Sequence, residues 1–189
     1  MIDREHGYLR GAQIQFLNTE ARYFPEREEW ELQAVDIIDI LSLAPTTRFT
    51  RPTSWEFHTG LALHDLVPED EFYLYRNQLG GGKAFEIGPH MLAYGMFNTT
   101  LEFSSRYASS TAWGAGASAG LIAVMGPYQQ TLSFKGLSFP FGLNGERWQA
   151  EWEQALHLGD RLALRIQYAF IEEKNLPRHE VAAGFYTYF

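Results

Sequence analysis

Histidine is the side chain most often used to bind metals and to move protons near neutral pH. The chain has six: His6, His58, His64, His90, His157 and His179. No pair has the spacing of a helical zinc site such as HExxH. His58 and His64 share one face of an alternating segment with Glu56, but the extended chain between the two histidines spans roughly 20 Å. One metal ion cannot bridge that distance. The pattern therefore predicts no metal site and favours a structural, hydrogen-bonding role for these side chains.

Residues of the types used in serine hydrolases also occur, as Ser104 and Ser105 and as the adjacent pair His64 and Asp65. None lies in a G-x-S-x-G turn that would expose a nucleophile. The glycine-rich LGGGK at 79–83 lacks the spacing of a phosphate-binding loop. The chain has no cysteine, which excludes thiolate nucleophiles and disulfides. The sequence therefore predicts no catalytic residue and no cofactor.

A third group of ionisable residues lies at alternate positions within apolar segments: Glu56, His58, Glu102, Lys135, Glu151, Glu153 and Arg165. Enclosed charges need partners, so we predict that these seven residues form a polar network in the interior of the fold. If Leu158 pairs near Leu162 across the turn that joins them, Glu153 lies opposite Gln167 and diagonal to Arg165. A charge pair there would hold the two strands in register.

The elements that must position these residues are strands, because apolar and polar residues alternate with period two along most of the chain. Ten strands are predicted, at 11–24, 30–44, 53–65, 73–88, 91–107, 111–125, 128–141, 147–158, 161–173 and 179–189. The segment 26–44 also fits an amphipathic helix, and as a strand it places Asp36 and Asp39 on opposite faces. Three glycines at 80–82 could hold a bulge that moves Lys83 to the other face.

The connections between these strands are predicted to alternate in length. From the third connection on, longer ones alternate with the tight GPH, GP and GD turns. This pattern is typical of an up-and-down meander whose tight turns share one end with the C-terminus, as in outer-membrane barrels. The predicted fold is therefore all-β, an antiparallel up-and-down transmembrane β-barrel of about ten strands, with 1–189 as a single domain.

Two further patterns favour a barrel with its polar face inside. Gly114, Gly116, Ser118 and Gly120 share one strand face, where they would make room for long side chains from neighbouring strands. Aromatic residues predicted toward strand ends, as in the girdles of membrane barrels, are Trp55, Trp113, Trp148, Tyr107, Tyr128, Phe185 and Phe189.

The charge and the apolar runs of the sequence limit the kinds of partner that the chain is expected to bind. The formal net charge of −8 argues against nucleic-acid binding. No run approaches the roughly 18 apolar residues of a membrane-spanning helix, and the N-terminus does not have the pattern of a secretory signal peptide.

The last residues, HEVAAGFYTYF, resemble the C-terminal signal that the barrel assembly machinery reads in bacterial outer-membrane barrels. Phe189 holds the terminal aromatic place, Gly184 the glycine place, and Phe185 an outward place. Thr187 departs from the pattern, because an aromatic is commoner there. The resemblance implies a location in the outer membrane of Gram-negative bacteria, with the lipid bilayer and the assembly machinery as partners.

A wider resemblance rests on GAQIQFLN, ARYFP, DIIDILSLAP and LGDRLALRIQY. These blocks resemble the C-terminal barrel region of a bacterial family of unknown function. Its longer members carry a periplasmic domain similar to lipoprotein transacylases and papain-like enzymes, and strand-forming sequence before the first block. The chain is therefore expected to be a fragment, a shortened relative or part of a split gene.

The function that this resemblance implies is a membrane anchor or scaffold for an attached or partner periplasmic domain, without enzyme activity. Two alternatives stay open. One is a soluble lipocalin-like or β-sandwich ligand-binding domain with its apolar faces inside. The other is an outer-membrane enzyme with a loop active site that includes His64, Asp65 and Ser104.

Overall fold

The computed structural model describes residues 12–24, 28–47, 49–64, 72–107, 109–143, 145–159, 162–173 and 176–187. Ten strands run through them: β1 (Ala12–Phe24), β2 (Glu29–Ser42), β3 (Ser54–His64), β4 (Phe72–Glu86), β5 (Met91–Phe103), β6 (Thr111–Met125), β7 (Tyr128–Phe141), β8 (Gly145–His157), β9 (Leu162–Glu173) and β10 (Leu176–Thr187). The strands predicted from alternation are confirmed, and 26–44 contains a strand, β2, instead of a helix.

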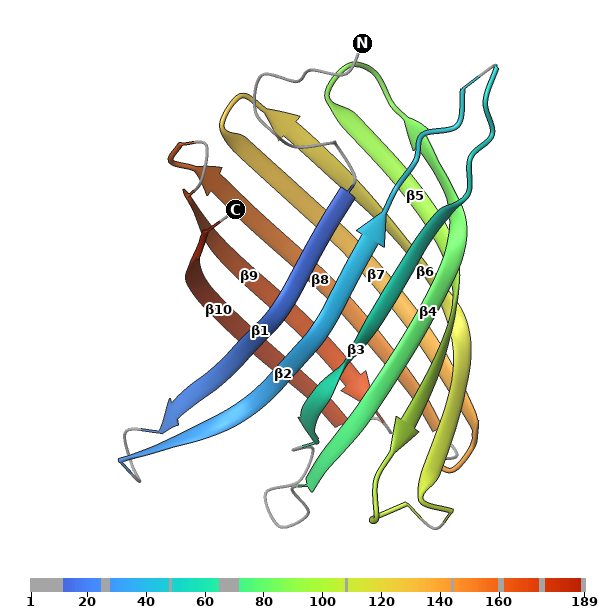
Figure 1. The fold of residues 1–189 in the computed structure, drawn as a ribbon, viewed down its shortest axis with the longest axis vertical. Coiled ribbons are helices and arrows are strands. Elements are labelled where there is room, and N and C mark those ends of the chain that lie inside the picture. The colour runs from blue at the N-terminus through green and yellow to red at the C-terminus, as the bar shows by residue number, and fades with distance from the viewer. Residues whose placement is uncertain are drawn as a thin grey trace.

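The strands form one antiparallel sheet in sequence order, from β1 at one edge to β10 at the other. The sheet curls into a half-barrel, so that β1 and β2 lie across the interior from β8 to β10 (Figure 1). The up-and-down topology is as predicted. Within the described residues, β1 and β10 are not paired, so the sheet has two edges. No helix in the described part of the chain is long and apolar enough to cross a membrane.

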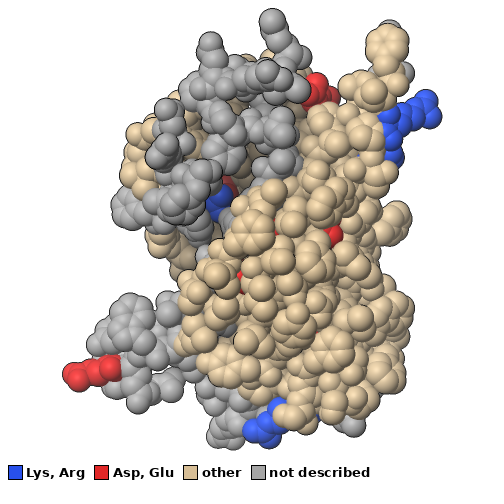
Figure 2. All heavy atoms as spheres, in the orientation of Figure 1, with Lys and Arg blue, Asp and Glu red and all other residues tan. Residues whose placement is uncertain are grey.

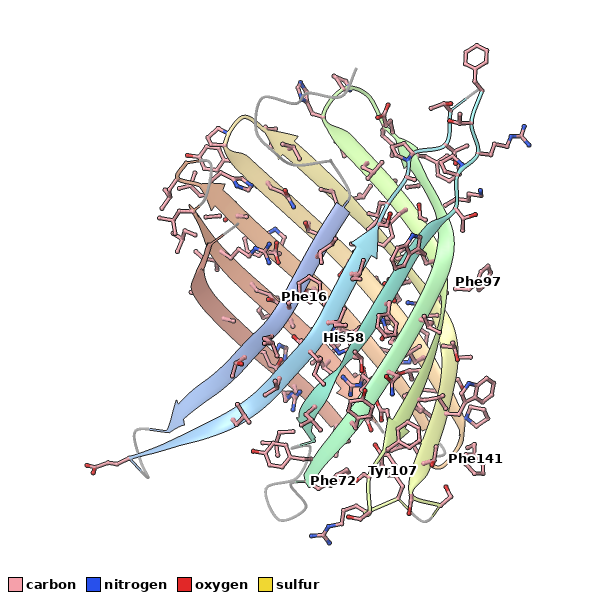
Figure 3. The ribbon with its side chains drawn as sticks, in the orientation of Figure 1. Phe16, His58, Phe72, Phe97, Tyr107 and Phe141 are labelled. Carbon is pink, nitrogen blue, oxygen red and sulfur yellow. The ribbon has the colours of Figure 1, made fainter. Side chains whose placement is uncertain are left out.

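The two faces of the sheet differ in polarity. On the convex face, Trp152 and Ile166 are 42% and 43% exposed, whereas Arg165, beside Ile166 in β9, is 9% exposed on the concave face. Phe97 of β5 points away from the sheet (Figure 3). The convex surface over β3 and β4 carries few charged atoms between its two ends (Figure 2). The apolar residues of the strands therefore point outward and the polar residues point into the curl.

Apolar residues also form two clusters on the concave face, one near each end. Leu43, Ala84, Leu92, Met96 and Ile122 pack together where β4 and β6 end. Leu74, Tyr107, Ala112, Leu137 and Phe139 pack together where the same two strands begin. The polar side chains lie between these two clusters.

Two details of the prediction are wrong. Strand β2 has a register shift between Asp36 and Ile38, so Asp36 pairs with Gly60, Asp39 pairs with His58, and both aspartates face inward. The Gly80–Gly82 run holds no bulge, because β4 pairs without a shift on both sides. Lys83 therefore stays on the convex face, where its Nζ donates hydrogen bonds to the carbonyl oxygens of Arg51 and Pro52 at 2.9 and 2.8 Å.

The predicted alternation of connection lengths is confirmed only in part. The short connections 87–90 and 126–127 lie at one end, and the longer 65–71 and 104–110 lie at the other. However, only residues 174–175 separate β9 from β10, because Leu176, Pro177 and Arg178 continue the ladder against Glu173, Glu172 and Ile171. The long segment 43–53 lies at the same end as the tight turns.

Candidate functional site

The strongest electrostatic feature of the interior is Glu102 on β5, whose side chain is fully buried. Nε of Arg76 on the neighbouring β4 donates to its Oε1 at 2.8 Å. Nη1 of Arg147 on β8 donates to the same oxygen at 2.6 Å, and Nε of Arg147 reaches Glu173 on β9 at 2.6 Å. Two carboxylates and two guanidinium groups thus compensate one another, which a buried charge requires.

The connection between β5 and β6 completes this cluster. Tyr107, which is 7% exposed, donates its hydroxyl hydrogen to Oε2 of Glu102 at 2.9 Å. Its ring packs edge-on against Phe72, with centroids 5.8 Å apart, and both rings lie at the lower end of the sheet in Figure 3. Burial and the adjacent Glu102 carboxylate raise the pKa of the Tyr107 hydroxyl above its usual range. The prediction that Tyr107 belongs to an outer girdle is wrong, because this residue folds inward and caps the interior.

Glu56 on β3 is the centre of a second cluster, midway along the interior. Its Oε1 accepts hydrogen bonds from the side-chain amides of Gln78 on β4 and Asn98 on β5. Lys135 on β7 places its Nζ 3.5 Å from the same oxygen. Ser118 on β6 donates to Oδ1 of Asn98 at 3.1 Å. One carboxylate therefore connects side chains from four strands.

Glycines on the concave face make these cross-strand contacts possible. A Cβ atom on Gly80 of β4 would lie 2.5 Å from the side chain of Glu56, which crosses that strand to reach β5. Side chains on Gly114 and Gly120 of β6 would collide with the rings of Phe139 and Tyr94. The predicted role of the β6 glycines, making room for long inward side chains, is confirmed at these two positions.

The remaining predicted network residues lie on the walls around these clusters. Nε2 of His58 is 3.6 Å from Oδ1 of Asp36. Glu151 accepts a hydrogen bond from Nε2 of Gln167 at 2.9 Å. Glu153 pairs with Gln167 in the ladder, as the sequence predicted, and lies 3.6 Å from Nη1 of Arg165. Each of the seven residues therefore lies on the concave face beside a polar or charged partner from a neighbouring or facing strand.

Sequence reasoning missed four members of the buried cluster around Glu102: Arg76, Arg147, Glu173 and Tyr107. Alternation places Arg76 on the same face as Gln78, and Arg147 on the same face as Gln149 and Glu151. That signal could have identified both arginines as inward residues. It could not have shown that Arg147 meets Glu102, because two strands separate them in the sheet.

The described residues contain no cluster of three or more metal-ligating side chains. Ser104 Oγ donates to the carbonyl oxygen of Tyr73 at 3.4 Å and accepts from the amide of Arg106 at 3.3 Å. The side chain of His64, and the whole of Asp65, lie outside the described residues.

Two of the three predicted assembly-signal residues fall on β10. Gly184 pairs with Arg165 and Phe185 with Leu164, so the backbone places Phe185 at an outward position. The side chain of Phe185 and the whole of Phe189 lie outside the described residues.

The geometry defines a class of protein: a ten-stranded, antiparallel, up-and-down half-barrel with an apolar convex face and a charge-paired interior. A family model described as "Domain of unknown function (DUF7840)" matches residues 1–188, and the chain belongs to that family. No curated protein and no solved structure matches it significantly.

Proposed function

We propose that the chain is an outer-membrane β-barrel domain that anchors an attached or partner periplasmic domain. The observation that carries the proposal is the polarity of the sheet, with apolar residues outside and paired charges inside. Water-soluble sheets bury their apolar face, whereas membrane barrels turn it toward lipid. The arrangement supports the membrane domain over the soluble lipocalin-like alternative.

The distribution of outward polar groups supports the same placement. The outward charged residues of the described strands are Lys83 near one end, and Glu146 and Glu172 near the other. A polar group that faces hydrocarbon must be satisfied by other protein groups.

Outward hydroxyl and amide groups meet this requirement. Thr59 Oγ1 lies 2.7 Å from the hydroxyl of Tyr75 and donates to Oδ1 of Asn77 at 2.8 Å. Nε1 of Trp113 donates to Oγ1 of Thr99 at 2.9 Å. These pairs suit a surface from which water is excluded.

The filled interior supports an anchor over a general porin. Ion pairs join facing strands at Glu56–Lys135 and Glu102–Arg147, and an apolar cluster packs in the interior near each end. About ten strands enclose little more than their own side chains. A solute-filled channel would require these pairs to separate.

A periplasmic partner fits the direction of the strands. With an even number of antiparallel strands, β1 begins at the same end at which β10 finishes. Outer-membrane barrels turn their short connections toward the periplasm, and the tight 87–90 and 126–127 connections lie at that end. A domain attached before β1 would therefore face the periplasm.

Fractionation tests the proposal. The chain, expressed behind an outer-membrane export signal, should remain in the membrane pellet after carbonate or urea washing and should require detergent for release. It should migrate faster on a gel unheated than boiled, because closed barrels resist unfolding by detergent alone. A chain that stays in the soluble fraction without detergent would contradict the proposal.

A further inference from the structure

The two sheet edges that β1 and β10 form within the described part of the chain carry a further inference, which rests on the membrane placement proposed above. Lipid offers no hydrogen bonds, so an open sheet edge does not persist in the hydrocarbon region. β1 and β10 run antiparallel to each other, since nine antiparallel steps separate them. We propose that β1 and β10 of the same chain pair directly, in the register that sets Arg22 opposite Glu180.

Neighbouring strands are offset along their length, and the total offset across the sheet, called the stagger below, suits this closure. Following the ladder at right angles to the strands from Ala12 leads to Ser42, Trp55, Gly81, Phe97, Ala117, Gly136, Trp148, Glu172 and Pro177. The path starts at the first residue of β1 and ends near the first residue of β10, at the opposite end of the sheet. A barrel closes when this stagger is comparable to the number of strands.

Only some registers keep inward residues facing inward, because side chains alternate along each strand. In three of these registers most residues of β1 face a residue of β10, and Glu180 then lies opposite Asn18, Glu20 or Arg22. Allowing for the extra residue at Leu17, which has a φ of 52°, they correspond to a total stagger of about 8, 10 or 12 residues.

Strand tilt excludes the first register. With strands about 4.8 Å apart and a rise of about 3.3 Å per residue, staggers of about 8, 10 and 12 give tilts of roughly 29°, 35° and 40°. Membrane barrels have tilts of about 35–45°. The register that sets Asn18 opposite Glu180 falls below this range.

The charges of the facing residues select between the two remaining registers. A stagger of about 10 sets Glu20 opposite Glu180 and Arg22 opposite Arg178, and like charges directly opposite each other destabilise a sheet. A stagger of about 12 sets Arg22 opposite Glu180, which combines opposite charges at inward positions. On the convex side, the same register sets Ala21 opposite Val181, a pair suited to lipid.

Cysteine cross-linking tests the register, since the chain contains no cysteine of its own. A disulfide forms between directly opposed residues but not between residues much more than about 7 Å apart. The variant Ala21→Cys/Val181→Cys, oxidised after folding in detergent or lipid, should give an intramolecular disulfide in most molecules. The offset pair Ala21→Cys/His179→Cys, which fits a stagger of about 10, should give several-fold less. The pair Ile166→Cys/Ala183→Cys, opposed in the ladder, is the positive control.

Three results would overturn the inference. More efficient cross-linking of the offset pair would show a different register. A disulfide-linked dimer would show that a second copy covers the edges. No cross-link at Ala21 and Val181, with the positive control fully oxidised, would show that other strands fill the seam. Gel migration of unheated samples separates these results from failure of the membrane proposal, because a chain that never inserts shows no heat-dependent shift in any variant.

Discussion

Arg147 Nη1 lies 2.6 Å from Glu102 Oε1, although two strands separate β8 from β5 in the sheet. The contact forms only because the sheet curls enough to bring these inward faces together. The same guanidinium group also bonds Glu173 on β9 and lies 4.9 Å from the centre of the Phe139 ring. One side chain therefore connects three strands and stabilises the curvature of the half-barrel.

Replacing Arg147 should be among the most damaging single changes. Arg147→Met leaves two buried carboxylates with less compensation, and breaking a buried pair costs about 3–5 kcal/mol. Urea unfolding of the folded protein, followed by tryptophan fluorescence, measures the loss. Arg51→Met, at an exposed loop position, is the matched control and should change stability by less than about 0.5 kcal/mol. Equal stability of the two variants would contradict the role given to Arg147.

The hydroxyl of Tyr107 should matter because its partner is a buried carboxylate. Tyr107→Phe removes that hydrogen bond at nearly constant volume, and such bonds to charged groups contribute about 1.5–3 kcal/mol. Tyr73→Phe, which removes the exposed hydrogen bond to the carbonyl oxygen of Leu32, should cost less. Urea unfolding curves of the two variants measure both losses of stability. A smaller loss for Tyr107→Phe than for Tyr73→Phe would contradict the importance of the hydrogen bond to Glu102.

The pH dependence of stability should change in the same variant. The pKa of Tyr107 is raised in the folded protein, so its stabilising contribution is present below the ordinary tyrosine pKa of about 10 and is lost as the pH rises above that value. The stability difference between wild type and Tyr107→Phe should therefore narrow above about pH 10. A difference that stays constant from neutral pH to that range would contradict the buried environment of the phenol.

The ring of Tyr94 should make glycine necessary at position 120. A Cβ atom there would lie 2.6 Å from the ring of Tyr94, whereas a Cβ atom on Gly81 would meet nothing within 4 Å. Overpacking costs about 1–3 kcal/mol, so Gly120→Ala should destabilise the protein and Gly81→Ala should not. The cost should shrink in a Tyr94→Ala background. An undiminished cost there would mean that contact with Tyr94 is not the cause.

The predicted assembly signal can be tested in cells. Deleting Phe189 should lower the amount of chain recovered in outer membranes several-fold, because the terminal aromatic is the best match to the signal. Lys174→Ala, in the β9–β10 connection, is a control of similar position in the chain. Unchanged recovery after the deletion would argue against recognition of this terminus by the assembly machinery.

Much of the fold could be predicted because strand alternation is a local property of the sequence. Alternation and one tight turn were enough to set Glu153 opposite Gln167, a register that the structure confirms. The shared face of Asp36 and Asp39 could not be predicted, since it depends on a bulge that no glycine or proline marks. Contacts between distant strands, such as Glu102 with Arg147, depend on how tightly the sheet curls, and local patterns do not determine that curvature.

The central claim is that the convex face meets lipid. Leu132 points outward near the middle of β7, and a nitroxide spin label can be attached there in Leu132→Cys. The label collides with oxygen, which concentrates in hydrocarbon, or with a nickel chelate, which stays in water. The two collision rates report which of these surrounds the label. In reconstituted bilayers the account predicts high oxygen and low chelate accessibility at Leu132, and the reverse for a label at Phe49→Cys, which is 97% exposed on the 43–53 connection. High chelate accessibility at Leu132 would contradict the membrane placement.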